Sequence, residues 1–347
     1  AGYYKVKAVK DGCTTVTSNV LTIPPAVTGL TLALTCGSSA DITPPDEHIT
    51  SHPANPTASR TAAFGFTGSD DASPPVTFTC SIDGKPASSC TSGVSYTGLA
   101  DGTHTFALVA HDTAGNTTKP TTYDWRVDAT KPTVKLTGSM PAFTLASQVT
   151  ITWSGSDAGS GIAHYQLHYR RAAYNGGFPS TWTLPSAWKA LTSLKVTASL
   201  TAGYDYCYQV QAIDRAGNAS GWSASQCVAR PLDDRSMSAT AGWTRGTSSA
   251  YYLSTYTSTT RYGAALTKSS VALDRIGVVA TKCASCGVIG IYVGTKLIGK
   301  VNLASSTTKY KVLILLPKFS LRTGKVTLKV LTTGKKVLID GLAVSRT

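Results

Sequence analysis

Apolar and polar residues alternate along two short stretches of the chain, and both stretches run into the same turn motif. His104–Val109 and Tyr206–Val210 show the period of two that places successive side chains on opposite faces of a β-strand. Each is followed by A-x-D-x-A-G-N, at residues 110–116 and 212–218. Asp accepts hydrogen bonds from nearby backbone N–H groups, and Gly and Asn tolerate a positive φ. The pattern therefore predicts two strands that each enter a hairpin turn.

The repeated motifs also divide the chain into modules. A Gly-Ser-Asp tripeptide precedes each turn motif, at residues 68–70 and 155–157. Units of about a hundred residues with short strands and frequent turns are typical of β-sandwiches, so we expect sandwiches in series. The predicted divisions are residues 1–24, the C-terminal remnant of a further sandwich that ends at Pro24-Pro25; 25–131, a sandwich that is partly irregular over the proline-containing stretch 25–60; 132–232, a second sandwich; and 233–347, a last module.

The last module has a different pattern. Turns are predicted at Gly294–Lys296 and Thr333–Lys335, and no segment of the module has a helical period of 3.6. We therefore expect an all-β chain that ends in a two-sheet sandwich of the jelly-roll type. The strand candidates are Ser270–Leu273, Ile276–Ala280, Val288–Val293, Lys311–Leu316, Lys325–Leu331 and Val337–Val344.

Three resemblances to known families rest on these patterns. Residues 57–131 resemble the Ig-like repeats of large, repetitive actinobacterial surface proteins, through Phe78–Gly84, Cys90, Tyr96–His104 and the first turn motif. Residues 132–230 resemble fibronectin III-like modules, through Gly159–Ile162, the tyrosine-rich stretch 204–208 and Gly221-Trp222-Ser223. Residues 243–344 are similar to jelly-roll modules appended to secreted actinobacterial proteins, some of them glycoside hydrolases, through Thr255–Thr257, Gly263-Ala264, Ile291–Gly294 and Ile339–Leu342. Together these resemblances imply an extracellular, multidomain and non-catalytic segment.

Charge is the most uneven property of the chain. The formal net charge is +14, of which residues 1–131 contribute −3, residues 132–232 contribute +4 and residues 233–347 contribute +13. A basic block of this kind indicates a polyanionic partner or a solubility effect. No stretch of eighteen apolar residues occurs, which excludes a transmembrane helix from the sequence.

The eight cysteines suggest an oxidising compartment. Cys207 and Cys227 flank the second turn motif and could face each other across a strand pair. For the C-x-x-C at Cys283–Cys286 we favour a structural disulfide over a zinc site or a redox centre, because no histidine and no βαβ pattern accompanies it. The resemblance to Ig-like repeats implies that Cys80 pairs with Cys90. Cys13 and Cys36 remain, and they pair either with each other or, for Cys13, with a residue upstream of Ala1.

Candidate catalytic residues are sparse. Glu47 is the single glutamate, and the last module contains four aspartates, Asp233, Asp234, Asp274 and Asp340. A glycosidase requires two carboxylates across a cleft, and neither a nucleophile elbow nor an H-E-x-x-H motif is present. We therefore expect no enzyme and no cofactor. Calcium is the one metal worth testing, because Asp70 with Asp112, or Asp157 with Asp214, could converge from neighbouring loops, although capping of turns by Asp is the commoner role.

Aromatic and basic residues give candidate ligand surfaces in the last third of the chain. Exposed aromatic rings stack on sugars, whereas lysine is a hydrated point charge suited to unspecific contact with polyanions. Trp153, Trp182, Trp188 and Trp222 form a further aromatic group in the second sandwich. The ligand-binding candidates of the last module are Trp243, Tyr251, Tyr252, Tyr256 and Tyr262, with Lys309, Lys311, Lys325, Lys329, Lys335 and Lys336.

These observations favour a structural and adhesive segment of a secreted or cell-surface protein. In this hypothesis the sandwiches form a stalk, and the basic jelly roll binds an anionic wall polymer or polysaccharide rather than a specific nucleic acid. One alternative is the carbohydrate-targeting region of a secreted hydrolase whose catalytic domain lies upstream. Another is a self-assembling surface fibre or virion appendage, in which the chain would bind further copies of itself.

Overall fold

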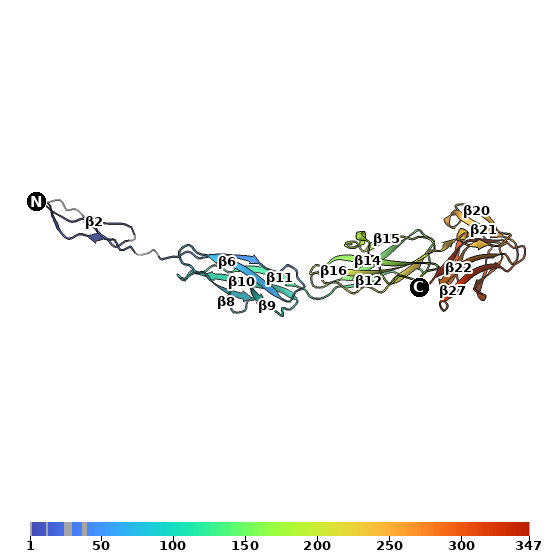
Figure 1. Cartoon of the computed structure of the whole chain (residues 1–347), viewed down its shortest axis with the longest axis horizontal. Helices are drawn as coiled ribbons and strands as arrows, with labels where there is room; N and C mark the ends of the chain where they lie inside the picture. The colour runs from blue at the N-terminus through green and yellow to red at the C-terminus, as the bar shows by residue number, and fades with distance from the viewer. Residues whose placement is uncertain (1, 12, 24–29, 37–39, 347) are drawn as a thin grey trace. The chain divides into compact units, whose positions relative to one another are not determined.

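The computed structural model describes residues 2–11, 13–23, 30–36 and 40–346, and strands dominate throughout (Figure 1). The predicted all-β class is confirmed. The chain divides into two compact units, Ala1–Asp128 and Ala129–Thr347. The boundary predicted at residues 24 and 25 lies outside the described residues. None of the described helices has the length and apolar character that crossing a membrane requires.

The first unit begins with two small antiparallel pairs and continues into a sandwich. The pairs are β1 with β4 and β2 with β3, and the sandwich consists of a three-stranded sheet, β5-β6-β9, and a four-stranded sheet, β11-β10-β7-β8. The strands are β1 Gly2–Tyr4, β2 Lys7–Ala8, β3 Val16–Thr17, β4 Leu21–Ile23, β5 Asp46–Ser51, β6 Ala62–Ser69, β7 Thr77–Ile82, β8 Ser88–Cys90, β9 Val94–Tyr96, β10 Gly102–His111 and β11 Thr121–Val127.

Alternation along β10 builds the core of this sandwich. Phe106 and Leu108 are fully buried, while the residues between them are partly exposed. The ring of Phe64 stacks on Phe106 at 3.9 Å between centroids, and Trp125 lies edge-on to Phe64 at 5.2 Å. The strand predicted before the first turn motif is therefore present. Strand β5 was not predicted, because it lies inside the proline-containing stretch that we interpreted as partly irregular.

The second unit begins with a sandwich of two three-stranded sheets, β12-β13-β15 and β14-β16-β17, drawn mainly in green in Figure 1. Its core contains Trp153, Tyr165 and Tyr208, all nearly inaccessible to solvent. The strands are β12 Thr133–Thr137, β13 Gln148–Ser156, β14 Ile162–Ala173, β15 Lys195–Ser199, β16 Tyr204–Asp214 and β17 Gln226–Ala229, with a 3₁₀ turn, η1, at Ser186–Trp188.

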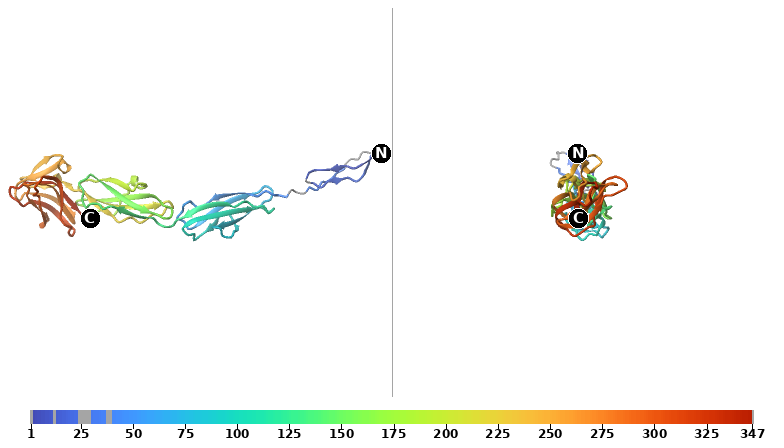
Figure 2. Two further views of the ribbon diagram at one scale, coloured as in Figure 1. Left: turned by 180° about the vertical axis from the view of Figure 1, so that it is seen from behind. Right: turned by 90° about the vertical axis from the view of Figure 1, so that its right-hand side faces the viewer.

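The last module is a sandwich of two antiparallel sheets (Figure 2), which agrees with the predicted architecture. One sheet has the order β20-β21-β28-β23-β26, with β18 beside β28, and the other has the order β19-β22-β27-β24-β25. The elements are β18 Leu232–Asp233, η2 Asp234–Ser236, β19 Ser238–Ala239, β20 Thr244–Thr247, η3 Tyr252–Ser254, β21 Thr255–Thr259, β22 Ala265–Leu273, β23 Arg275–Lys282, β24 Val288–Val293, β25 Lys296–Asn302, β26 Lys309–Leu315, β27 Arg322–Val330 and β28 Val337–Ser345.

Strand β28 is buried along its whole length. Leu232 of β18 pairs with β28 in the same sheet and belongs to the core of the last module. Ala343 of β28 also belongs to a small core with Phe143 and Ala229, which joins the two sandwiches of the second unit. Burial on both faces explains why β28 reads as a continuous apolar run instead of an alternating one. All six strand candidates of the module correspond to strands, whereas β18–β21 and β25 were not predicted.

Candidate functional site

The eight cysteines form four disulfides. The C-x-x-C of the last module is closed by a bond of 2.07 Å, so its two sulfurs present no thiolate to a metal. Cys207 and Cys227 face each other across β16 and β17, as their positions around the turn motif suggested. The four bonds are Cys13–Cys36, Cys80–Cys90, Cys207–Cys227 and Cys283–Cys286.

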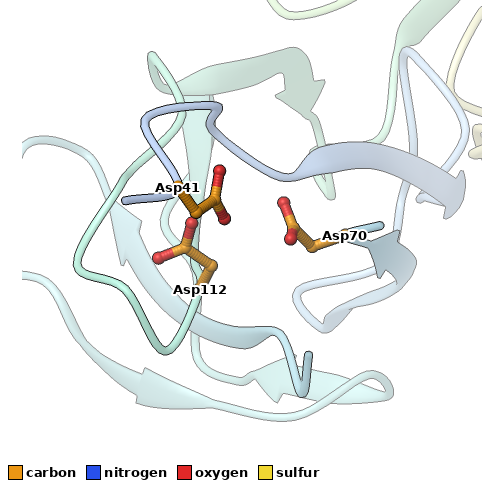
Figure 3. A group of neighbouring side chains, drawn as sticks. All are labelled: Asp41, Asp70 and Asp112. Carbon is orange, nitrogen blue, oxygen red and sulfur yellow. The ribbon is translucent and has the colours of Figure 1, made fainter. Parts of the chain in front are cut away.

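Three carboxylates converge at one end of the sandwich of the first unit, and Figure 3 shows them close together. Asp41 comes from the loop before β5, Asp70 follows β6, and Asp112 follows β10. One oxygen from each carboxylate lies within 4.8 Å of the others. The sequence identified Asp70 and Asp112 as candidates that could converge, but it gave no signal for Asp41.

Asp112 and Asp70 also accept hydrogen bonds from the backbone of their own loops. Asp112 Oδ1 accepts hydrogen bonds from the backbone N–H groups of Gly115 (2.7 Å) and Asn116 (2.8 Å), which is the turn capping expected of the repeated motif. Asp70 Oδ1 accepts from the N–H groups of Ala72 and Ser73. These contacts fix the carboxylates in place and use only part of their capacity to accept.

Asp41 has an oxygen that is both inaccessible to solvent and without such contacts in the described part of the chain. Its Oδ1 accepts from the backbone N–H of Thr43 at 3.0 Å and from the Thr43 hydroxyl at 2.6 Å. Hydrogen bonds from Ser73 and Thr43 lower the pKa of Asp41, so it is ionised at neutral pH. Its Oδ2 is inaccessible to solvent and meets no hydrogen-bond donor among the described residues. Clustered, fixed carboxylate oxygens are ligands that suit Ca²⁺.

The second copy of the motif repeats the turn geometry. Asp214 Oδ1 accepts from the backbone N–H of Asn218 at 2.8 Å, and its Oδ2 accepts from the Asn218 side-chain amide at 2.8 Å. Asp157 Oδ2 accepts from the N–H of Gly161 at 2.7 Å, and oxygens of Asp157 and Asp214 lie within 4.8 Å of each other. The loops at the Gly-Ser-Asp tripeptide and at the turn motif are thus neighbours in both sandwiches.

The tyrosines of the last module fall into two groups. Tyr252 is 3% exposed and donates its hydroxyl to the Pro231 carbonyl at 2.9 Å, and burial raises its pKa to about 12. It therefore lacks the exposed ring face that a sugar platform requires, and this candidate was wrong. Tyr251 stacks on Tyr256 at 4.2 Å, and Tyr310, which the sequence analysis did not select, lies edge-on to Tyr251 at 5.2 Å.

The remaining aromatic candidates lie elsewhere in this module. Trp243 is half-buried and packs against the core. Tyr262 is 60% exposed and stands apart from the Tyr251–Tyr256 stack, beside a shallow pocket formed with Thr240 and Arg261. The predicted aromatic set therefore does not form one continuous surface.

Lysines of the last module are exposed, but they are spread over both sheets. Lys309 and Lys311 lie on β26 of the first sheet, Lys325 and Lys329 lie on β27 of the second, and Lys335 and Lys336 lie in the loop that precedes β28. The register places Lys329 and Lys300 opposite Gly290 on its two sides, so both project from the same outer face as Lys325. We call Lys300, Lys325 and Lys329 the basic face.

The four acidic residues of this module are buried or partly buried. Asp234 and Asp340 are fully buried, and Asp274 forms an ion pair with Lys318 at 3.0 Å. Asp234 accepts hydrogen bonds from the hydroxyls of Thr255 and Thr257. Asp340 is the extra residue of a β-bulge in β28.

The tryptophans of the second sandwich also separate into core and surface. Trp153 is 2% exposed, which excludes it as a platform. Trp182 and Trp222 instead enclose His168, with ring centroids 4.2 Å and 3.5 Å from the imidazole. The His168 ring also contacts Gln209 Oε1 through Nε2 at 2.8 Å. The stack of Trp182, His168 and Trp222 is built on β14. It lies beside Arg170, whose guanidinium lies 4.8 Å from the Trp182 ring centroid.

A scan against protein-family models gives no match, and a search of curated proteins gives none either. Among solved structures, the fibronectin III-like modules of CbhA from Clostridium thermocellum align with 53% of this chain and 95% of theirs, at 19% identity and a TM-score of 0.34. Carbohydrate-binding modules of the β-sandwich superfamily align with 88% of this chain and 100% of theirs, at 11% identity and a TM-score of 0.25. A tetra-tandem repeat from the extending region of a large adhesion protein covers 98% of this chain and 80% of its own, at 14% identity and a TM-score of 0.24. At these scores the likeness carries no argument about function.

Proposed function

We propose that this chain is a non-catalytic, adhesive segment of an extracellular protein, and that its last module binds an anionic polysaccharide or wall polymer. The observation that carries the proposal is the separation of charge within residues 233–347. Lysines are exposed on both sheets, while Asp234 and Asp340 are fully buried and Asp274 is paired. The surface of the module is therefore more uniformly positive than its composition alone would make it, and such a surface attracts polyanions over long distances.

Four disulfides support the extracellular setting. Disulfides persist in oxidising compartments and are rare in the cytosol. Closing a loop of this kind contributes about 2–4 kcal/mol by restricting the unfolded chain. The stretch Ala1–Asp128, which has its own sandwich, serves in this proposal as the structural part of the segment.

Binding of the full chain to immobilised polygalacturonate tests the proposal. We expect the affinity to fall steeply between about 50 and 200 mM NaCl, because each neutralised charge releases a counterion. The triple variant K300Q/K325Q/K329Q removes the basic face and should lower the slope of log affinity against log salt by about two to three. The matched control K5Q/K7Q/K10Q loses the same charge from exposed lysines of the first unit and should leave the slope unchanged. The proposal is contradicted if the affinity does not change with salt, or if the slope falls equally in both variants.

We propose in addition that the cluster of Asp41, Asp70 and Asp112 holds Ca²⁺. Two features support it: carboxylate oxygens within 4.8 Å of one another, and the solvent-inaccessible Asp41 Oδ2, which meets no donor in the described part of the chain. A bound cation would offset the electrostatic repulsion between carboxylates that lie this close together.

A further inference from the structure

An open cavity of about 460 Å³ lies at the surface of the second unit, where its first sandwich meets the last module. Strands β14, β16 and β17 provide one wall, and the opposite wall comes from the start of β23 and the residue after β28. The lining residues that matter here are Met140, Ala142, Phe178, Arg170, Arg275 and Arg346. Three of these are arginines, and none is acidic.

The two walls are held together by direct contacts. Asp205 Oδ2, on β16, accepts hydrogen bonds from the Ser345 hydroxyl at 3.2 Å and from the Arg346 backbone N–H at 3.0 Å. Phe143, Ala229 and Ala343 form a small apolar core beside these bonds. The cavity is thus a pre-formed feature of a packed junction, and a ligand would not have to assemble it.

The arginines present hydrogen-bond donors that nothing nearby accepts. Arg170 Nε, Arg275 Nε and Arg346 Nη2 are inaccessible to solvent and have no acceptor among the described residues. None of the three forms an ion pair within the described ranges. The Nε of an arginine lacks an acceptor at other places in the described chain as well, and Arg346 interacts electrostatically with Asp205. What distinguishes this cavity is that three such arginines meet in it, and a cluster of unsatisfied charged donors favours an anionic partner.

The shape of the donors indicates the kind of anion. A guanidinium presents parallel N–H groups that match the two oxygens of a carboxylate. Arg170 is additionally fixed in orientation, because its guanidinium lies over the rings of Phe178 (5.0 Å) and Trp182 (4.8 Å). Phe178, Met140 and Ala142 supply an apolar side to the same cavity, suited to the face of a sugar ring.

We infer that this cavity binds one acidic sugar residue, with its carboxylate on the arginines and its ring against the apolar side. The choice of an acidic saccharide rests on the proposed function, but the site is separate from the basic face. A cavity near 460 Å³ falls within the range of small-ligand sites, about 300–1,000 Å³, and is large enough for a monosaccharide.

The chain has two methionines, which makes the inference easy to test. Met140 lines the cavity, and Met237 is 2% exposed in the core of the last module. In the full chain labelled with ¹³C-methyl methionine, titration with glucuronate should shift the Met140 signal and leave Met237 in place. The double variant R275Q/R346Q should weaken this binding at least tenfold, because hydrogen bonds to charged groups each contribute about that factor. R261Q, which removes an exposed arginine of the same module, should bind like the parent chain.

Three comparisons decide between the outcomes. Glucose that shifts Met140 as strongly as glucuronate overturns the role of the carboxylate, and inorganic phosphate that matches glucuronate overturns the role of the sugar ring. No shift of Met140, or an R275Q/R346Q variant that binds like R261Q, overturns the site itself. The variant K300Q/K325Q/K329Q separates this inference from the proposed function, since it should lose polymer binding while its Met140 signal still responds to glucuronate.

Discussion

Carboxylates of the first unit and of the last module have opposite environments. In the first unit, Asp41 has a lowered pKa because Ser73 and Thr43 donate hydrogen bonds to it. In the last module, burial raises the pKa of Asp340 to about 7, and the nearby Asp234 and Asp233 add to the rise while Lys311 opposes it. The first unit therefore stabilises negative charge at its loops, whereas the last module suppresses negative charge in its interior.

This difference shows how one residue type can serve two electrostatic purposes. An ionised cluster near the surface can attract a cation, as proposed for Asp41 with Asp70 and Asp112. A buried carboxyl contributes no charge to the surface when it is protonated, so in that state it offsets none of the positive charge of the exposed lysines of the last module. Changing one carboxyl at a time tests this difference.

The largest effect is expected from Asp340→Asn, which replaces the buried carboxyl by a neutral group of the same shape. Because the pKa of Asp340 is higher in the folded state than in the unfolded chain, the stability it contributes is complete below about pH 4 and is lost as pH rises to 7. A shift of about three units corresponds to roughly 4 kcal/mol. At pH 8 the variant should therefore be more stable than the parent by up to that amount, and at pH 3 the two should agree.

Hydrogen exchange of peptides from β21, β23 and β28 measures this effect within the full chain. Protection at pH 8, corrected for the intrinsic exchange rate, should be greater in the variant. The comparison at pH 3 is the control, since Asp340 is then largely protonated in both the folded and the unfolded state. If the parent and the variant keep the same protection at both pH values, Asp340 does not have the raised pKa on which the comparison depends.

A smaller effect is expected when Ca²⁺ is added to the first unit. Saturating Ca²⁺ should stabilise the loops around residues 41, 70 and 112 by about 1–3 kcal/mol, depending on its excess over the dissociation constant. Asp41→Asn should abolish the response, because it removes a charge but leaves an oxygen that can still accept from Thr43. The control Asp46→Asn changes an exposed carboxylate of β5 in the same unit and should respond like the parent. Hydrogen exchange of the parent and both variants, measured with Ca²⁺ and with EDTA, tests these expectations. Equal protection of the parent under the two conditions contradicts the calcium proposal.

The sequence could predict whatever depends on periodicity and local motifs. Alternation identified β10 and β16, and the A-x-D-x-A-G-N motif predicted turns that Asp112 and Asp214 do cap. It could not reveal Asp41, because that residue joins the cluster from a loop far away in the chain and no local motif surrounds it. It likewise could not separate Tyr252 from Tyr256, since neighbouring aromatic residues differ in burial only once η3 and β21 have formed.

The arrangement of the basic residues could likewise be predicted only in part from the sequence. Lysine counts predicted a basic module, but sheet membership decides which lysines share a face, and the register pairs Lys329 and Lys300 across Gly290. The arginine-lined cavity was invisible to the sequence, because Arg170, Arg275 and Arg346 lie far apart along the chain and meet only where two sandwiches pack together.

The smallest predicted effect compares two histidines. Burial opposes the charged form of His104, but the Ala100 carbonyl and the Asp83 carboxylate, 2.9 Å and 2.8 Å from its ring nitrogens, more than offset this and raise its pKa. Burial between Trp182 and Trp222 lowers the pKa of His168, although its contact with Gln209 acts in the opposite direction. His104 should therefore titrate above the ordinary histidine pKa, and His168 below it.

The two shifts have opposite consequences for stability. The contribution of His104 is complete below its unfolded pKa and is lost as pH rises through the higher folded value, whereas that of His168 is gained as pH rises through about 6.5. NMR titration of the two imidazoles measures both. Asp83→Asn should lower the pKa of His104 and leave His168 unchanged, and Trp222→Ala should raise the pKa of His168 and leave His104 unchanged. If His168 titrates above His104 in the parent chain, the aromatic enclosure does not exclude water as the ring distances require.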